Sequence, residues 1–233
     1  AITVAHASLQ RHGHLPAHVL SFRLWAVVKL DLPTYICEAL LCRCAEGLLS
    51  EGAATSNVEG MQWCPQGLAN VAWSAVKLSL CGSHMGYAMA ALVCAAAAEQ
   101  ARPCLEPFRP QELSMMAWAC ATMHGRKQSG NNAGRRAAAA LTRAAEEINV
   151  KEPPTLDIER LMAPIADIAR RRLDELSPQS LSNVAWSLAT VGLQFTKPAK
   201  DFYYLDIVCP PGLGATQCSY MCMWSILNSI QFN

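Results

Sequence analysis

Charged residues are scarce in this chain: Asp, Glu, Lys and Arg make up 16% of its 233 residues and nearly cancel, to a formal net charge of +1. Such a balance excludes a strong whole-molecule attraction to nucleic acid or anionic lipid. Apolar residues make up 52% of the chain, which is enough to form a core and argues against disorder through most of its length. We therefore expect a folded protein.

Signatures of the common enzyme classes are missing too. The chain has no GxSxG, no HExxH, no P-loop and no dinucleotide fingerprint, and no pattern supplies a cysteine with an activating base. Its eleven cysteines include no CxxC pair and are expected to be small buried hydrophobic residues in a reducing compartment. Two sets come closest to a zinc site but lack its second ligand pair: Cys37, Cys42 and Cys44, and His12, His14 and His18. We expect no catalysis, no cofactor and no metal.

Long unbroken hydrophobic runs are also lacking. The uncharged stretch 78–98 is rich in alanine and contains Gly82 and Gly86, and the uncharged residues after Asp206 are interrupted by Pro210 and Pro211. Neither stretch is suited to a membrane span.

One helical phrase recurs along the chain. It is clear at 65–80 (PQGLANVAWSAVKLSL), 110–124 (PQELSMMAWACATMH) and 178–192 (PQSLSNVAWSLATVG), and more divergent at 17–31 and 216–230. The phrases align on a tryptophan, with spacings of 48, 45, 68 and 38 residues: Trp25, Trp73, Trp118, Trp186 and Trp224. These spacings lie within or near the range of helical-hairpin repeats, except for the long gap. That gap predicts an additional helix at 155–176.

The phrase predicts its own geometry. A proline lies eight residues before the tryptophan in the three clear copies, at Pro65, Pro110 and Pro178, where it suits the first turn of a helix. Leu68, Val71, Ala75 and Leu78 form one buried face at roughly 100° per residue. The apolar arc is wide enough to need neighbours on two sides. Small residues before the tryptophan, such as Ala72 and Ala117, allow close helix approach, and the tryptophans themselves are interpreted as core or ridge packing.

The segments between the phrases, at 33–49, 84–98, 132–148 and 197–208, are expected to be the hairpin partners. Those at 84–98 and 132–148 are rich in alanine, a strong helix former. The sequence thus predicts an all-α fold, an α-solenoid of stacked helix-turn-helix repeats that spans 1–233 as one array. A globular helical bundle is the alternative.

A variable polar stripe lies three residues before, one after and four after the tryptophan. It varies from copy to copy while the apolar frame is constant, which is typical of a readout surface; a solvated helix face is the alternative. The candidate residues are Asn70, Ser74, Lys77, Thr122, Asn183, Ser187 and Thr190.

A locally basic segment between Arg102 and Arg143 has seven basic residues against Glu106 and Glu112. Its candidate phosphate contacts are Arg126, Lys127, Arg135, Arg136 and Arg143. Arg170, Arg171 and Arg172 form a second group, for which an alternative interpretation is a helix C-terminus that complements the helix dipole.

The phrase resembles the octotricopeptide repeat, which is related to heptatricopeptide-type repeats. The residues that carry the resemblance are Pro65, Leu68, Ala69, Asn70, Trp73, Ala75, Lys77 and Leu78, then Leu181, Ser182, Asn183, Trp186 and Ala189, with a weaker match around Trp118. The last spacing, 38 residues, agrees with the length of the family's repeat. The resemblance implies a mitochondrial or chloroplast α-solenoid that acts on organellar RNA.

The sequence therefore favours a noncatalytic helical-repeat protein that binds single-stranded organellar RNA or rRNA, in RNA maturation, stability or translation. The stripe would face the bases, as in other helical-repeat RNA readers, and basic residues would hold phosphates. The low net charge supports an alternative, a structural or adaptor subunit of a large organellar assembly, such as a ribosome or membrane complex, that binds mainly protein.

Overall fold

The computed structural model describes residues 15–49, 63–80, 86–128 and 156–192, and the single positions Glu146 and Pro154. Every regular element in these ranges is a helix, so the described part of the chain is all-α. The α-helices are α2 (Ala17–Lys29), α3 (Thr34–Leu49), α4 (Pro65–Leu80), α5 (Gly86–Ala101), α6 (Pro110–Gln128), α8 (Ile158–Arg171) and α9 (Pro178–Val191), and the two 3-10 turns are η1 (Arg102–Cys104) and η2 (Leu173–Glu175).

The helix starts agree with the sequence prediction. Pro65, Pro110 and Pro178 are the first residues of α4, α6 and α9, where a missing N–H costs nothing. Side chains cap two of these starts. The Ser177 Oγ accepts from the Ser180 N–H at 3.1 Å, and the Glu112 carboxylate accepts from the backbone N–H of Arg109 at 2.8 Å. The proline-initiated helices are confirmed.

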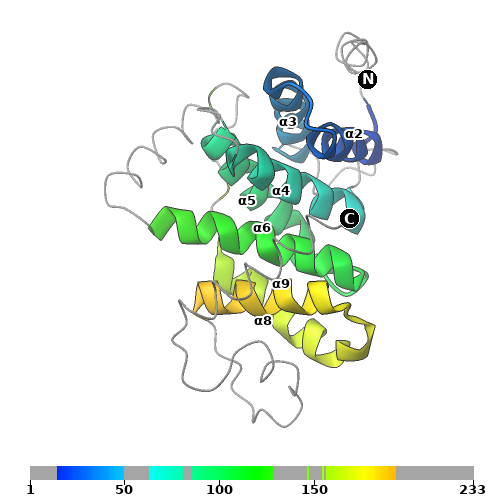
Figure 1. The fold of residues 1–233 in the computed structure, drawn as a ribbon, viewed down its shortest axis with the longest axis vertical. Helices are drawn as coiled ribbons and strands as arrows, with labels where there is room; N and C mark the ends of the chain where they lie inside the picture. Colours follow the sequence, from blue (N-terminus) through cyan, green and yellow to red (C-terminus); the bar gives the residue numbers. More distant parts are fainter. Residues whose placement is uncertain are drawn as a thin grey trace.

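The four described tryptophan helices contact one another in chain order: α2 packs on α4, α4 on α6, and α6 on α9. Figure 1 shows α2, α4, α6 and α9 following one another along the length of the molecule. A second set of helices lies against this row. α3 contacts α2 and α5, α5 contacts α4 and α6, and α8 contacts α6 and α9.

The core lies between the two sets of helices. Leu68, Val71, Ala75 and Leu78 of α4 are all buried, as the helical periodicity predicts, and so are Ala72 and Ala117 before the tryptophans. The Gln100 amide of α5 donates to the Leu48 carbonyl of α3 at 2.8 Å, which links two helices of the second set. Burial of this apolar surface is the main driving force for the packing.

Trp63, just before α4, is a buried tryptophan that the repeat pattern does not include. Its Nε1 donates to the Gly47 carbonyl of α3 at 3.4 Å. A Cβ on Gly47 would lie 3.3 Å from the Trp63 ring, so a larger residue at 47 would crowd the indole. The pair joins the first hairpin to the second.

Several predicted elements differ in extent or lie outside the described residues. The additional helix expected at 155–176 is shorter, because α8 ends at Arg171 and η2 follows it. The partner segments at 33–49 and 84–98 correspond to α3 and α5. The partner segments at 132–148 and 197–208 and the last phrase, 216–230, lie outside the described residues, apart from Glu146.

Candidate functional site

The tryptophan helices share an exposed face that includes the indoles themselves. Trp25, Trp73, Trp118 and Trp186 are all half-buried. The positions seven before and four after each tryptophan lie within about 40° of it around the helix. The glutamines that follow the initiating prolines occupy the first of these positions and are exposed in all three clear copies: Gln66, Gln111 and Gln179. The tryptophans are therefore ridge residues.

Lysines connect the indoles of the first three tryptophan helices. The Lys29 Nζ lies 5.9 Å from the Trp25 ring centroid and 5.2 Å from that of Trp73. The Lys77 Nζ lies 5.6 Å from the Trp73 centroid and 5.8 Å from that of Trp118. These are cation–π distances. Each ammonium thus lies beside the indoles of two successive tryptophan helices. We call this set the Trp–Lys ladder: Trp25, Lys29, Trp73, Lys77 and Trp118.

The ladder stops where threonine replaces lysine. The Thr122 Oγ1 donates to the Trp118 carbonyl at 2.7 Å, and the Thr190 Oγ1 donates to the Trp186 carbonyl at 2.8 Å. Both hydroxyls therefore bond within their own helix, a common arrangement for Thr. Lysine at this position adds a cation to the exposed face, whereas threonine adds only a short polar side chain.

The two ladder lysines form no ion pair with any carboxylate in the described residues. Three arginines of η1 and α8 differ in this respect. Arg102 pairs with Glu99, Arg160 pairs with Asp157, and Arg170 pairs with Asp167. Within the described residues, an anionic ligand therefore meets positive charge without an ion pair at the ladder and paired charge at these arginines.

Three of the predicted base-facing residues are buried, which argues against a base-facing role for them. Ser74 and Ser187 have exposed fractions of 0% and Asn70 has 8%. The position after the tryptophan lies roughly 100° from it, on the packed side of the helix. The Ser187 hydroxyl donates to the Asn183 carbonyl at 2.6 Å, which lets this small polar residue be buried.

The other stripe residues remain partly exposed. Lys77, Thr122, Asn183 and Thr190 are half-buried on the exposed side of their helices. Their base-facing role stays a prediction. Sequence reasoning missed the exposed glutamines, although their recurrence directly after each proline was a usable signal.

Ser74→Ala is expected to leave the free energy of unfolding unchanged or to raise it by about 1 kcal/mol. The Ser74 Oγ is buried and has no hydrogen-bond partner among the described residues, so the substitution removes an unsatisfied hydroxyl. Ser187→Ala is the matched control, because it breaks a hydrogen bond and is expected to lower stability by about 1 kcal/mol. Urea unfolding measures both. A loss of RNA affinity in a stable Ser74→Ala protein would restore the base-facing assignment.

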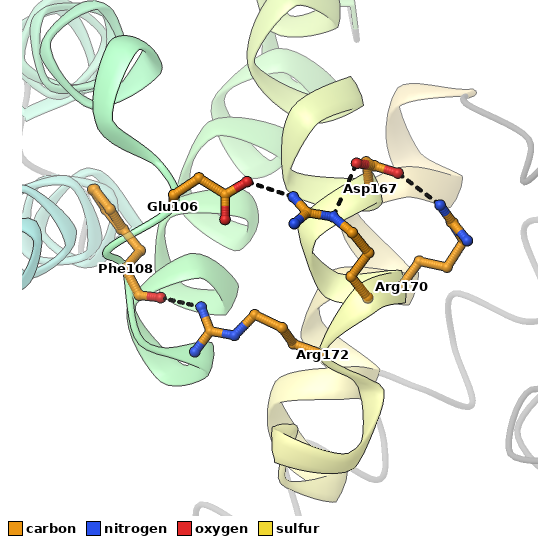
Figure 2. Close-up of polar contacts among 6 residues, drawn as sticks. Glu106, Phe108, Asp167, Arg170 and Arg172 are labelled. Atoms are coloured by element: carbon orange, nitrogen blue, oxygen red, sulfur yellow. Dashed lines mark hydrogen bonds and ion pairs between the residues drawn. The ribbon is translucent and has the colours of Figure 1, made fainter.

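Three consecutive arginines lie at the end of α8, and two of them, Arg171 and Arg172, hold it to the rest of the molecule. Arg171 pairs with Glu106 in the connector before α6 and with Asp167 one turn earlier in α8. The Arg172 Nη1 donates to the Phe108 carbonyl at 2.8 Å. Figure 2 shows these contacts joining α8 to the connector before α6.

These pairs also shift pKa values. The hydrogen bond from Arg172 lowers the pKa of Glu175, and the hydrogen bond from Arg170 is the main cause of the lowered pKa of Asp167. Both carboxylates are therefore charged at neutral pH. The arginine run is a helix C-terminus with paired charges, so the phosphate-binding hypothesis for it is not favoured.

The side chains of the main phosphate candidates all lie outside the described residues. Arg126 and Lys127 belong to the last turn of α6, but their side chains lie outside the described residues. Arg135, Arg136 and Arg143 also lie outside the described ranges. Their role as phosphate contacts stays a prediction.

A hollow of about 450 Å³ lies between α8 and the connector that leads to α6. Three prolines line it, Pro103, Pro107 and Pro164, with the charged residues Arg102, Glu106, Asp167 and Arg171. Each of these charged groups is in an ion pair. The hollow therefore offers shape but little uncompensated charge for recognising a ligand.

The buried thiols are poor nucleophiles. Burial raises the pKa of Cys120 to about 12 and raises that of Cys94 well above its ordinary value. Both are protonated at neutral pH, whereas the thiolate is the reactive form. Among the described residues, no three His, Cys, Asp or Glu side chains gather closely enough to hold a metal ion.

No described helix has both the length and the apolar character needed to cross a membrane. Comparisons with protein-family models, with curated proteins and with solved structures return no match to this chain. A functional proposal therefore depends on the residues and geometry described above.

Proposed function

We propose that this chain is a noncatalytic α-solenoid that binds single-stranded RNA through the exposed face of its tryptophan helices. The observation that carries the proposal is the Trp–Lys ladder, in which two lysines without an ion pair to a described carboxylate alternate with three half-buried indoles. Aromatic platforms beside cations are the usual means of binding single-stranded nucleic acid.

The packing of the helices supports the solenoid part of the proposal. The tryptophan helices contact one another in chain order, and α3 and α5 form a second row against them. In such an array each unit covers the core of the next, and one continuous face is left for a long ligand. A single-stranded RNA is a ligand of that shape.

The cellular setting is the part of the proposal that depends on the repeat resemblance. An octotricopeptide-like protein would act in a mitochondrion or chloroplast, in the maturation, stability or translation of organellar RNA. The partly exposed Thr122, Asn183 and Thr190 would then contact bases. Arg126, Lys127, Arg135, Arg136 and Arg143 would hold phosphates.

A second candidate function is a structural or adaptor subunit of a large organellar assembly that binds mainly protein. It is favoured by the arginine run of α8, whose charges are compensated by Asp167, Glu106 and Glu175. With these three cations paired and a net charge of +1, the chain offers little net positive charge for neutralising phosphates, on which RNA affinity largely depends.

Binding of the purified chain to a pool of random single-stranded RNA, at two salt concentrations, tests the proposed function. We expect submicromolar, salt-dependent retention, and sequencing of the retained RNA to show an enriched motif. An absence of retention at moderate salt would favour the adaptor, and the proteins that co-purify with the chain would then identify its partners.

A further inference from the structure

The lysine ammoniums of the ladder lie over the rings of its indoles. The lysine ammoniums lie 5.2 to 5.9 Å from the ring centroids, farther than the ~3.5 Å of a stacked ring. The four-carbon stem of a lysine is flexible. A flat ligand can therefore take the place of an ammonium against the indole at small cost, and the displaced ammonium stays close enough to pair with a negative group on the same ligand.

The site suits a ligand that has a flat group for the indole and a negative group for the ammonium. A nucleotide with an unpaired base fits it better than a cationic or purely anionic ligand. A second cation is repelled by Lys29 and Lys77, and a simple anion does not use the indoles. A nucleotide of a single strand carries a flat base and a phosphate together. Stacking on an aromatic side chain strengthens binding by roughly 5- to 150-fold per base, whereas an exposed cation–π contact is equivalent to only about 2- to 5-fold.

We propose that the Trp–Lys ladder is a stacking site for unpaired bases that accepts any base and does not distinguish RNA from DNA. The inference rests on the proposed function and deepens it by giving the exposed face of the tryptophan helices two separate roles. The indoles of α2, α4 and α6 hold the strand through base faces, which all bases share. Reading of base identity is left to α6 and α9, where threonine replaces the lysine. Duplexes, whose bases are stacked on one another, bind poorly at the ladder.

Trp73 is the residue to test, because it is the middle indole and contacts both ladder lysines. The probes are short single strands of oligo(U), oligo(A) and oligo(dT), an RNA duplex, and an abasic DNA strand that keeps the phosphates. Their dissociation constants are measured by fluorescence anisotropy with the full chain. We expect Trp73→Leu to bind all three base-containing strands roughly tenfold more weakly and to bind the abasic strand as the wild type does.

Tyr35→Leu is the control variant. Tyr35 is an exposed aromatic of α3 that is not a member of the Trp–Lys ladder, and its replacement is expected to leave all the affinities unchanged. Thermal melting followed by circular dichroism checks each variant. If Trp73→Leu does not fold, Trp25→Leu in the first helix replaces it, with the same expected selectivity for strands that carry bases.

The outcomes separate this inference from the proposed function. Unchanged affinity of folded Trp73→Leu for oligo(U), or an equal loss on the abasic strand, would overturn the stacking site while RNA binding stands. A wild-type preference for RNA over DNA that Trp73→Leu abolishes would also overturn it. A wild-type chain that binds none of the strands would overturn the proposed function and this inference together.

Discussion

Phe108→Ala lowers the free energy of unfolding by about 3–5 kcal/mol, the typical cost of removing a fully buried Phe side chain. Phe108 has an exposed fraction of 0% and is among the largest fully buried side chains. It lies in the connector between η1 and α6, and its carbonyl accepts the hydrogen bond from Arg172. A cavity at this point weakens the packing of α6 and the attachment of α8 together. Urea unfolding followed by circular dichroism measures the change.

Phe22→Ala is the matched control for this prediction, because it makes the same chemical change at a residue of α2 that is 59% exposed. Its ring centroid lies 5.9 Å from that of Trp25, so we expect a loss of about 1 kcal/mol or less. Equal destabilisation by the two substitutions would show that the connector around Phe108 is not part of the cooperative core.

The double variant Lys29→Thr/Lys77→Thr binds single-stranded RNA roughly tenfold more weakly than the wild type at low salt. Threonine is the natural choice, because α6 and α9 carry it at the same repeat position. Each lysine is expected to neutralise one phosphate. The slope of log affinity against log salt concentration should therefore fall by roughly 0.7 per lysine. Titrations at several salt concentrations measure both quantities.

A control with the same loss of charge is Arg160→Thr/Arg170→Thr. Both arginines are exposed, but each already pairs with an aspartate of its own helix region, Asp157 and Asp167. We expect little change in affinity or salt slope. Equal losses in the two double variants would mean that net charge alone sets the affinity, and the ladder would lose its place as the binding site.

Most of the local structure follows from short-range patterns in the sequence. Pro65, Pro110 and Pro178 mark helix starts, because proline at a first turn has the right φ and no N–H to satisfy. The apolar positions around each tryptophan predict a buried face wide enough for two neighbours, and Leu68 and Val71 are buried as expected. Both predictions depend only on residues within a few turns of one another.

The candidate site was only partly predictable. The polar stripe identified Lys77 and the threonines but also Ser74 and Ser187, which are buried. Polarity is a poor guide to exposure for Ser and Thr, since their hydroxyls can bond to a carbonyl of their own helix, as Ser187 does with Asn183. From the sequence, the tryptophans were interpreted as packing residues. The pattern within one helix does not show that its indole lies beside a lysine of the preceding tryptophan helix.

By itself, the sequence determined the helical class, the repeated phrase, the helix starts and the apolar face, because each depends on local backbone preference and on the 3.6-residue period. The tertiary structure alone decided that Lys29 reaches the Trp73 ring, and that Arg171 and Arg172 are used to hold α8. These are contacts between residues 44 or more positions apart. They arise from the way neighbouring helices pack, which the pattern within a single helix does not contain.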